Sequence, residues 1–390
     1  MRMSRFAPFL GFVVALAFFA LLSSFASEAL VWPAPVQGTP VASSTLSILP
    51  GLILPPITLP SLAPKTDSAT ATEEQTAPAP KKVAPPPVST APVPVPVVAP
   101  VPAPIPAPLP SSGGNVALDI SAAALRAALV NIICYVPLGS ALHSISGSGV
   151  FIDSKGIILT NAHVAQYFLL ADKGASCTIR TGSPAADSYK AALIYLPATW
   201  VSANADILTT IEPSGTGEYD FAFLAVTKSV TRNALPASFP FVPLASSPPG
   251  TGTPIVIASY GAQFLESSQI QYSLSPTVVF GSVKDIFTFK ANTIDVLALG
   301  GSAAAQEGSS GGGVADASGS LVGTITTSTT KGATDTRSLD AITTSYIRSA
   351  YASETGSALD LLLSLPTVLA IAAFAPQIPA LAAILTAGLP

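Results

Sequence analysis

Three residues with complementary chemistry follow one another along the chain. His163 comes after an apolar run and the sequence Thr-Asn-Ala, Asp220 opens another apolar run, and Ser310 lies in a glycine-rich turn. A serine hydroxyl is a weak nucleophile at neutral pH and needs an adjacent base, which a histidine oriented by a carboxylate supplies. The order His, Asp, Ser is one known layout of such a triad. We therefore expect His163 to act as the base, Asp220 to orient it, and Ser310 to attack a carbonyl carbon.

Each of these assignments has a competitor nearby. Asp206 also opens an apolar run, although the better strand pattern follows Asp220, so Asp206 remains the alternative acid. Ser309 adjoins Ser310, but only Ser310 is followed by two glycines and has a glycine two places before it. His143 lies in an earlier loop without such a context, and we interpret it as a structural residue.

The composition argues against two other classes of function. The chain has 390 residues, a net charge of −4 and only 10% charged residues, so it lacks the basic surface of a nucleic-acid-binding protein. Its two histidines and two cysteines show no metal-ligand spacing. We expect no cofactor, no metal and no nucleic-acid partner.

The first 115 residues predict export and a spacer. Residues 1–29 carry arginines at their start and then an uncharged apolar run, which is typical of a signal peptide but is also long enough for a membrane anchor. Residues 30–115 are rich in proline and alanine and predict an extended linker, because proline fixes φ and removes backbone donors. Either interpretation of the first segment places the remainder outside the cytoplasm.

The middle of the chain predicts an all-β fold. After a helix over 119–129, six short apolar segments with turn punctuation favour a small antiparallel barrel; they are 131–136, 149–152, 156–159, 177–181, 189–195 and 221–226. A second group favours a second six-stranded barrel; it comprises 254–258, 277–280, 283–289, 293–297, 313–315 and 321–326. A closing helix is predicted over 342–353.

The last segment, residues 354–390, predicts an apolar helical tail. No charged residue occurs from Leu361 to Pro390, and three prolines interrupt this run. Such a tail could enter a membrane as a hairpin, or it could pack on the folded domain or on another copy. The sequence leaves these two interpretations open, so membrane association through either end of the chain is one expectation.

The motifs around these residues resemble those of trypsin-like serine proteases with the chymotrypsin fold, especially the Deg/HtrA type. The resemblance lies in Ser-Gly-Ser-Gly-Val-Phe-Ile-Asp at 146–153, Gly-Ile-Ile-Leu-Thr-Asn-Ala-His-Val at 156–164, Asp-Phe-Ala-Phe-Leu at 220–224, Pro-Ile-Val-Ile-Ala-Ser-Tyr-Gly at 254–261 and Gly-Ser-Ser-Gly-Gly at 308–312. It covers residues 116–353, with the first barrel at about 116–232 and the second at about 233–353. The residues after this span are too few and too apolar for the peptide-binding PDZ module that Deg/HtrA proteins often carry.

The resemblance also implies the parts of a substrate site. The backbone N–H groups of Gly308 and Ser310 would form the oxyanion hole, and Ala304 would lie near the floor of the side-chain pocket. With no carboxylate there, the implied preference is for a small or aliphatic residue before the cut. The strand that contains Gly323 would bind the substrate backbone by strand addition. The chain departs from the family at Gly313, where proline is common, and at Ser309, where asparagine or aspartate is common.

The two cysteines fall in the first and fourth predicted strands. Those strands adjoin when a six-stranded barrel of this kind closes, so a disulfide between Cys134 and Cys177 is expected in an oxidising compartment. The alternative is two buried free thiols, which fits poorly with an export signal. The sequence as a whole predicts an extracytoplasmic serine endopeptidase that acts on polypeptides through an acyl-enzyme. The alternative is an inactive protease fold that serves as a binding or scaffold protein at the cell surface.

Overall fold

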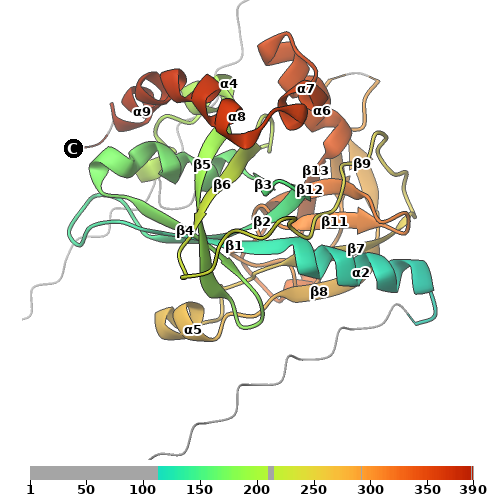
Figure 1. The fold of residues 1–390 in the computed structure, drawn as a ribbon. Helices are drawn as coiled ribbons and strands as arrows, with labels where there is room; N and C mark the ends of the chain where they lie inside the picture. The colour runs from blue at the N-terminus through green and yellow to red at the C-terminus, as the bar shows by residue number, and fades with distance from the viewer. Residues whose placement is uncertain (1–112, 210–214, 291, 388, 390) are drawn as a thin grey trace, which may run out of the picture. The chain divides into compact units, whose positions relative to one another are not determined.

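The computed structural model describes residues 113–209, 215–290, 292–387 and 389. The predicted signal or anchor at 1–29 and nearly all of the predicted linker at 30–115 lie outside the described residues. Within the described chain, two antiparallel β-sheets form the body, and helices α8 (Thr367–Phe374) and α9 (Ile378–Thr386) lie along the first of them (Figure 1).

The first sheet is a closed six-stranded barrel, as the sequence predicts. Its order is β1-β2-β3-β6-β5-β4, so the first and fourth strands are neighbours. Cys134 lies directly opposite Cys177 across this pair, and the two form the predicted disulfide, with an S–S distance of 2.07 Å. The strands are β1 (Leu129–Tyr135), β2 (Ile145–Asp153), β3 (Ile157–Thr160), β4 (Ser176–Thr181), β5 (Ala186–Tyr195) and β6 (Ala222–Ser229).

The second sheet has seven strands instead of the predicted six. Its order is β8-β7-β11-β12-β13-β10-β9, and it ends at β8 and β9 as a half-barrel instead of closing. The strands are β7 (Pro254–Ser259), β8 (Thr277–Ser282), β9 (Asp285–Phe287), β10 (Val296–Ala298), β11 (Gly313–Asp316), β12 (Leu321–Ser328) and β13 (Leu339–Thr343).

The strand that the sequence pattern missed is β13. Its final residue, Thr343, is also the N-cap of helix α6 (Thr344–Thr355), and the Thr343 hydroxyl accepts a hydrogen bond from the N–H of Tyr346. Because strand and helix meet without a loop, the apolar residues of β13 continue the helical pattern in the sequence. The predicted helix over 342–353 therefore began two residues too early.

Helix α2 (Val116–Ala128) joins the two sheets. Asn115 caps it by accepting a hydrogen bond from the N–H of Leu118. Its buried face packs against β7, β11 and β2. A Cβ at Gly313 would come within 2.7 Å of Leu125 in this helix and within 2.9 Å of Leu321 and Val150, so the packing around this position favours glycine.

Shorter helices connect the strands. They are α3 (Ala162–Ala165), η1 (Gln166–Lys173), α4 (Ala198–Ala203), η2 (Ile207–Thr209), α5 (Ser267–Tyr272) and η3 (Thr334–Thr336). The tail consists of α7 (Leu359–Ser364), α8 (Thr367–Phe374), η4 (Ala375–Gln377) and α9 (Ile378–Thr386).

The C-terminal tail packs on the first barrel. Helix α8 lies against β5, and α9 lies against α4 and η1. Phe374 and Leu385 are buried in this contact, whereas Val368 and Leu369 are exposed. The prolines that interrupt the apolar run stand at helix starts, where proline is tolerated. The sequence left open whether the tail packs on the domain, and in this structure it does.

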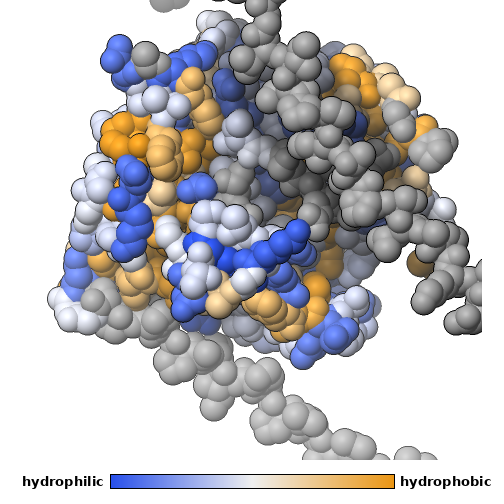
Figure 2. All heavy atoms as spheres, turned by 180° about the vertical axis from the view of Figure 1, so that it is seen from behind, coloured by the Kyte–Doolittle hydropathy of each residue, from blue (hydrophilic) through white to orange (hydrophobic). Residues whose placement is uncertain are grey.

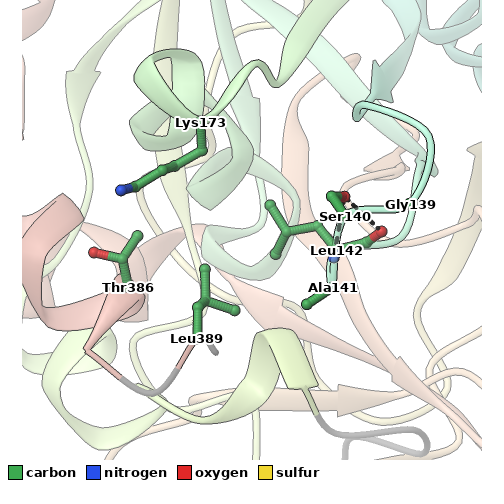
Figure 3. A pocket seen from close by; sticks show the side chains of 7 residues that line it. All are labelled: Gly139, Ser140, Ala141, Leu142, Lys173, Thr386 and Leu389. Atoms are coloured by element: carbon green, nitrogen blue, oxygen red, sulfur yellow. Dashed lines mark hydrogen bonds between the residues drawn. The ribbon is translucent and has the colours of Figure 1, made fainter.

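The tail nevertheless keeps an apolar outer surface. By length and composition, the helical segment 367–386 could cross a membrane, and 28% of it is buried against the rest of the protein. On the face opposite to that of Figure 1, hydrophobic residues gather in separate patches between hydrophilic ones (Figure 2). The end of α9 borders a hollow of about 560 Å³ (Figure 3). It is lined by Gly139, Ser140, Ala141, Leu142, Lys173, Thr386 and Leu389, none of them a predicted catalytic residue.

Candidate active site

His163 is positioned by the end of β3. The strand stops at Thr160, and the short helix α3 begins at Ala162, so the histidine lies in the first turn after a buried strand. The side chain of Asn161 donates to the carbonyl of Asp220 at 2.8 Å, which ties this turn to the start of β6. The imidazole keeps 29% of its surface exposed, so one side of the ring remains accessible.

Asp220 holds the histidine by two hydrogen bonds. Its Oδ2 lies 2.7 Å from Nδ1 of His163, and its Oδ1 accepts the backbone N–H of the same residue at 3.0 Å. The hydroxyl of Thr326, in β12, also donates to Oδ2 at 2.7 Å. The carboxylate is thus buried but fully paired, which compensates for its removal from water.

The interaction between His163 and Asp220 shifts the pKa values of both residues. Burial by itself would lower the pKa of His163, but the charge of Asp220 and their hydrogen bond outweigh it and raise this pKa above its ordinary value. Burial would likewise raise the pKa of Asp220, and the attraction of His163 with the hydrogen bonds outweighs it and lowers that pKa. Because Asp220 is ionised at neutral pH, Nδ1 of His163 carries a proton and Nε2 is the atom that can accept one.

The alternative acid, Asp206, and the other histidine, His143, lie away from this hydrogen bond. Asp206 is an exposed residue after α4, and His143 is exposed in the loop between β1 and β2. Among residues 113–209, 215–290, 292–387 and 389, the ring of His163 hydrogen-bonds only to Asp220. The geometry therefore favours Asp220 over Asp206 as the orienting acid.

Ser310 lies in a tight turn before β11. Gly308 and Gly311 adopt φ values of +89° and +85°, which residues with a side chain rarely adopt. Inside the turn, the N–H of Ser309 donates to Gln306 and that of Gly312 donates to Ser309, at 3.2 and 2.9 Å.

This turn is bonded to both sheets. The N–H of Gly311 donates to Ile325 of β12 at 2.9 Å, and the carbonyl of Ser310 accepts the N–H of Ser148 in β2 at 2.8 Å. A Cβ at Gly311 would collide with the carbonyl of Ser148 and the hydroxyl of Thr160. Because Thr160 precedes His163 by three residues, the serine turn lies against the strand that carries the histidine.

Two backbone N–H groups of the turn stay unpaired. The N–H groups of Gly308 and Ser310 have no hydrogen-bond acceptor within the described part of the chain, whereas those of Ser309, Gly311 and Gly312 all have one. The carbonyl of Glu307 accepts the N–H of Ala262 at 2.8 Å, which fixes the orientation of the peptide that contains the Gly308 N–H. The two free donors are those that the resemblance assigns to the oxyanion hole.

The hydroxyl of Ser310 has no hydrogen bond to His163 in this structure. Such contacts are often long in an enzyme without substrate and shorten when substrate binds. The structure thus joins His163 to Asp220 directly and brings the Ser310 turn against them through Ser148 and Thr160.

The structure places both predicted substrate-pocket residues, Gly323 and Ala304, inside the second sheet. Gly323 pairs with Val314 of β11 on one side and with Thr343 of β13 on the other. Both edges of its backbone are occupied, so a substrate strand cannot add at Gly323. The pairing with β11 ends at Thr324, and the serine turn occupies the same edge at Ile325, which exchanges hydrogen bonds with Gly311 and Gly312.

Ala304 does not line an open surface. It is completely buried in the core of the second sheet, next to Ala305. The carbonyl of Ala305 accepts a hydrogen bond at 2.7 Å from the guanidinium of Arg337, which is itself buried. No carboxylate oxygen binds this guanidinium within the described residues.

Sequence reasoning missed two residues that shape the site. Thr326 donates a hydrogen bond to the carboxylate of Asp220, although the two residues are 106 positions apart in the sequence. No local sequence pattern predicts such a contact. Ser148 was noticed only as part of a motif, yet it bonds to the serine turn through its backbone and its hydroxyl. In the part of the chain that the structure covers, no cluster of three or more His, Cys, Asp or Glu side chains could hold a metal ion.

Comparisons with known proteins give one family match and several solved structures of low similarity. Residues 147–323 match the family model described as a trypsin-like peptidase domain. Among solved structures, the active form of the Rv3671c protease from M. tuberculosis is 19% identical, with 67% of this chain and 95% of that chain covered and a TM-score of 0.39. The inactive form of the Rv3671c protease is also 19% identical, with 64% and 100% covered and a TM-score of 0.38. A search of curated proteins finds no match.

Proposed function

We propose that this chain, whose residues 147–323 match the model of a trypsin-like peptidase domain, is an endopeptidase that uses His163, Asp220 and Ser310 as a catalytic triad. The observation that carries this proposal is the 2.7 Å hydrogen bond between Nδ1 of His163 and the buried carboxylate of Asp220. It leaves Nε2 as the ring nitrogen that can accept a proton.

The reaction proceeds in two halves. The oxygen of Ser310 attacks the peptide carbonyl carbon while Nε2 of His163 takes the hydroxyl proton, and the carbonyl becomes an oxyanion. The C–N bond then breaks, the proton passes from His163 to the leaving amine, and an acyl-enzyme remains. A water molecule, deprotonated by His163, attacks the ester, and release of the acid restores the Ser310 hydroxyl.

The oxyanion is stabilised by the free N–H groups of Gly308 and Ser310. Fixed donors aimed at a developing charge are typically worth about 3 kcal/mol each, since they need no reorganisation during the reaction. The hydrogen bond between Glu307 and Ala262 supports this role, because it holds the Gly308 N–H in one orientation.

A fluorophosphonate probe tests the proposal. Intact mass should show one adduct on the full chain, and Ser310→Ala and His163→Ala should each abolish it. Ser309→Ala is the matched control for the neighbouring hydroxyl and should keep the adduct. Absence of an adduct on the folded native protein would contradict the triad and favour the scaffold alternative.

We propose that the enzyme cleaves after small or aliphatic residues. Arg337 carries a buried guanidinium, and no carboxylate of the described residues binds it, which disfavours lysine or arginine before the cut. Cleavage-site profiling with a peptide library is expected to show aliphatic residues before the cut. A preference for lysine or arginine would contradict this assignment.

We propose that the protease acts outside the cytoplasm and associates with a membrane through one of its ends. The disulfide between Cys134 and Cys177 supports an oxidising compartment, and the exposed Val368 and Leu369 support contact of the tail with lipid. Flotation with liposomes should therefore recover the full chain. If Val368→Glu together with Leu369→Glu leaves recovery unchanged, the tail is not the anchor and the N-terminal segment is tested next by truncation.

A further inference from the structure

We infer that Ser148 is a positioning residue that holds the oxyanion turn in its working conformation. The inference rests on the proposed function, because it concerns the turn that carries Ser310. Ser148 lies in β2 of the first barrel and is completely buried.

Every polar group of Ser148 is engaged around this turn. Its hydroxyl donates to the carbonyl of Gly308 at 2.7 Å and accepts the N–H of Tyr260 at 2.9 Å. Its own N–H donates to the carbonyl of Ser310 at 2.8 Å, and its carbonyl accepts the hydroxyl of Thr160 at 2.7 Å. One residue of the first barrel thus bonds both residues that carry the proposed oxyanion donors.

The turn needs such external restraints because of its glycine. Gly308 has φ +89° and no side chain, so rotation about its backbone bonds meets little steric resistance. Two successive carbonyls are fixed from outside: that of Glu307 by the N–H of Ala262, and that of Gly308 by the hydroxyl of Ser148. Without the second bond, the peptide after Gly308 is held only by the longer 3.2 Å hydrogen bond from the Ser309 N–H to Gln306. It can then rotate more freely, and the free N–H groups lose their common direction.

The restraint is also independent of charge. The groups that hold the turn are hydroxyls and backbone amides; for example, Ser259 donates to the buried hydroxyl of Ser309 at 3.0 Å. None of these groups titrates near neutral pH. Removal of the Ser148 hydroxyl should therefore change the rate of acylation without moving its pH midpoint, which belongs to His163 and Asp220.

The test compares Ser148→Ala with Ser146→Ala in the full chain. Ser146 is two residues earlier in the same strand, and its hydroxyl accepts the side-chain N–H of Asn131 at 2.9 Å, away from the turn. We expect Ser148→Ala to lower kcat and the labelling rate about 10- to 100-fold. KM should change less than about twofold, because the proposed donors stabilise the transition state more than the bound substrate. Ser146→Ala should behave like the native protein.

Further variants separate positioning from loss of fold. Ser148→Cys keeps the size of the side chain and a weak donor, and it should fall between the native protein and Ser148→Ala. The thermal transition of each variant shows whether it is folded at the assay temperature. Equal kcat in Ser148→Ala and Ser146→Ala would overturn the inference, and so would a shifted pH midpoint.

Failure of the proposed function has a different signature. In that case the native protein itself does not label. The positioning role of Ser148 is then tested by amide hydrogen exchange at Ser309 and Gly312, whose N–H groups are hydrogen-bonded inside the turn. Faster exchange in Ser148→Ala than in Ser146→Ala supports the positioning role, and equal exchange overturns it.

Discussion

The two sheets contribute to the candidate site by different physical means. In the closed barrel, His163 and Asp220 lie next to strands β3 and β6 and are joined by a charged, partly buried hydrogen bond. In the open sheet, Ser310 stands in a glycine turn that neutral hydrogen bonds hold against the barrel. The base is therefore oriented by charge and barrel closure, whereas the nucleophile depends on contacts that cross between the sheets.

The largest expected effect comes from removing the charge in the barrel. Asp220→Asn should lower kcat about 10⁴-fold, because the amide no longer enforces the tautomer in which Nε2 of His163 accepts a proton. Hydrolysis of a peptide ester measures this loss. Asp206→Asn is the matched control, and a comparable loss in that variant would show that the acid was wrongly assigned.

The corresponding test of the open sheet changes its glycine turn. Gly311→Ala should lower the labelling rate of Ser310 about 100-fold, because the new methyl group collides with the carbonyl of Ser148 and displaces the turn. Gly319 has a similar φ of +79° but open space around it. Gly319→Ala should therefore cost only about 1 to 2 kcal/mol of backbone strain and keep the labelling rate. Equal rates in the two variants would contradict the close contact between the sheets.

A third effect concerns stability and should be confined to the closed barrel. The disulfide closes a segment of 43 residues, and its loss should reduce the free energy of unfolding by about 4 kcal/mol. Cys134→Ser combined with Cys177→Ser tests this by denaturant unfolding. Because neither cysteine contacts the serine turn in the described hydrogen-bond network, labelling well below the unfolding transition should stay near the native rate. A strong loss of labelling under these folded conditions would argue against separate roles for the two sheets.

The smallest effect is the pH dependence of the charged pair. His163 must be neutral to accept a proton, so the labelling rate should fall as pH falls through its raised pKa, with a midpoint above 6.5. The raised pKa of His163 stabilises the fold below pH 6.5, and this contribution is lost as pH rises through the folded value. The lowered pKa of Asp220 stabilises the fold above pH 3.8 and is lost on further acidification.

The pair of His163 and Asp220 should therefore stabilise the protein most between pH 3.8 and 6.5. This range lies below the pH at which the labelling rate reaches its midpoint. Denaturant unfolding of the native protein and of Asp220→Asn over this range measures the contribution. An identical pH dependence in both proteins would contradict the assignment of the shift to this pair.

The sequence predicted what local patterns encode. The candidate residues His163, Asp220 and Ser310 and the strands of the closed barrel follow from short motifs and runs of apolar residues. The pairing of Cys134 with Cys177 followed from the barrel order that the family resemblance implies. Strand β13 was missed because it leads into α6 without a break. The site contacts of Thr326 and Ser148 were missed for another reason: they join residues more than 100 positions apart.

The crystal structure of the fluorophosphonate adduct tests the central claim most directly. The account predicts a covalent bond to Oγ of Ser310, with the phosphonyl oxygen within hydrogen-bond distance of the N–H groups of Gly308 and Ser310, and Nε2 of His163 turned toward the adduct. A phosphonyl oxygen directed away from these two N–H groups, or a carbonyl of Glu307 rotated off Ala262, would contradict it.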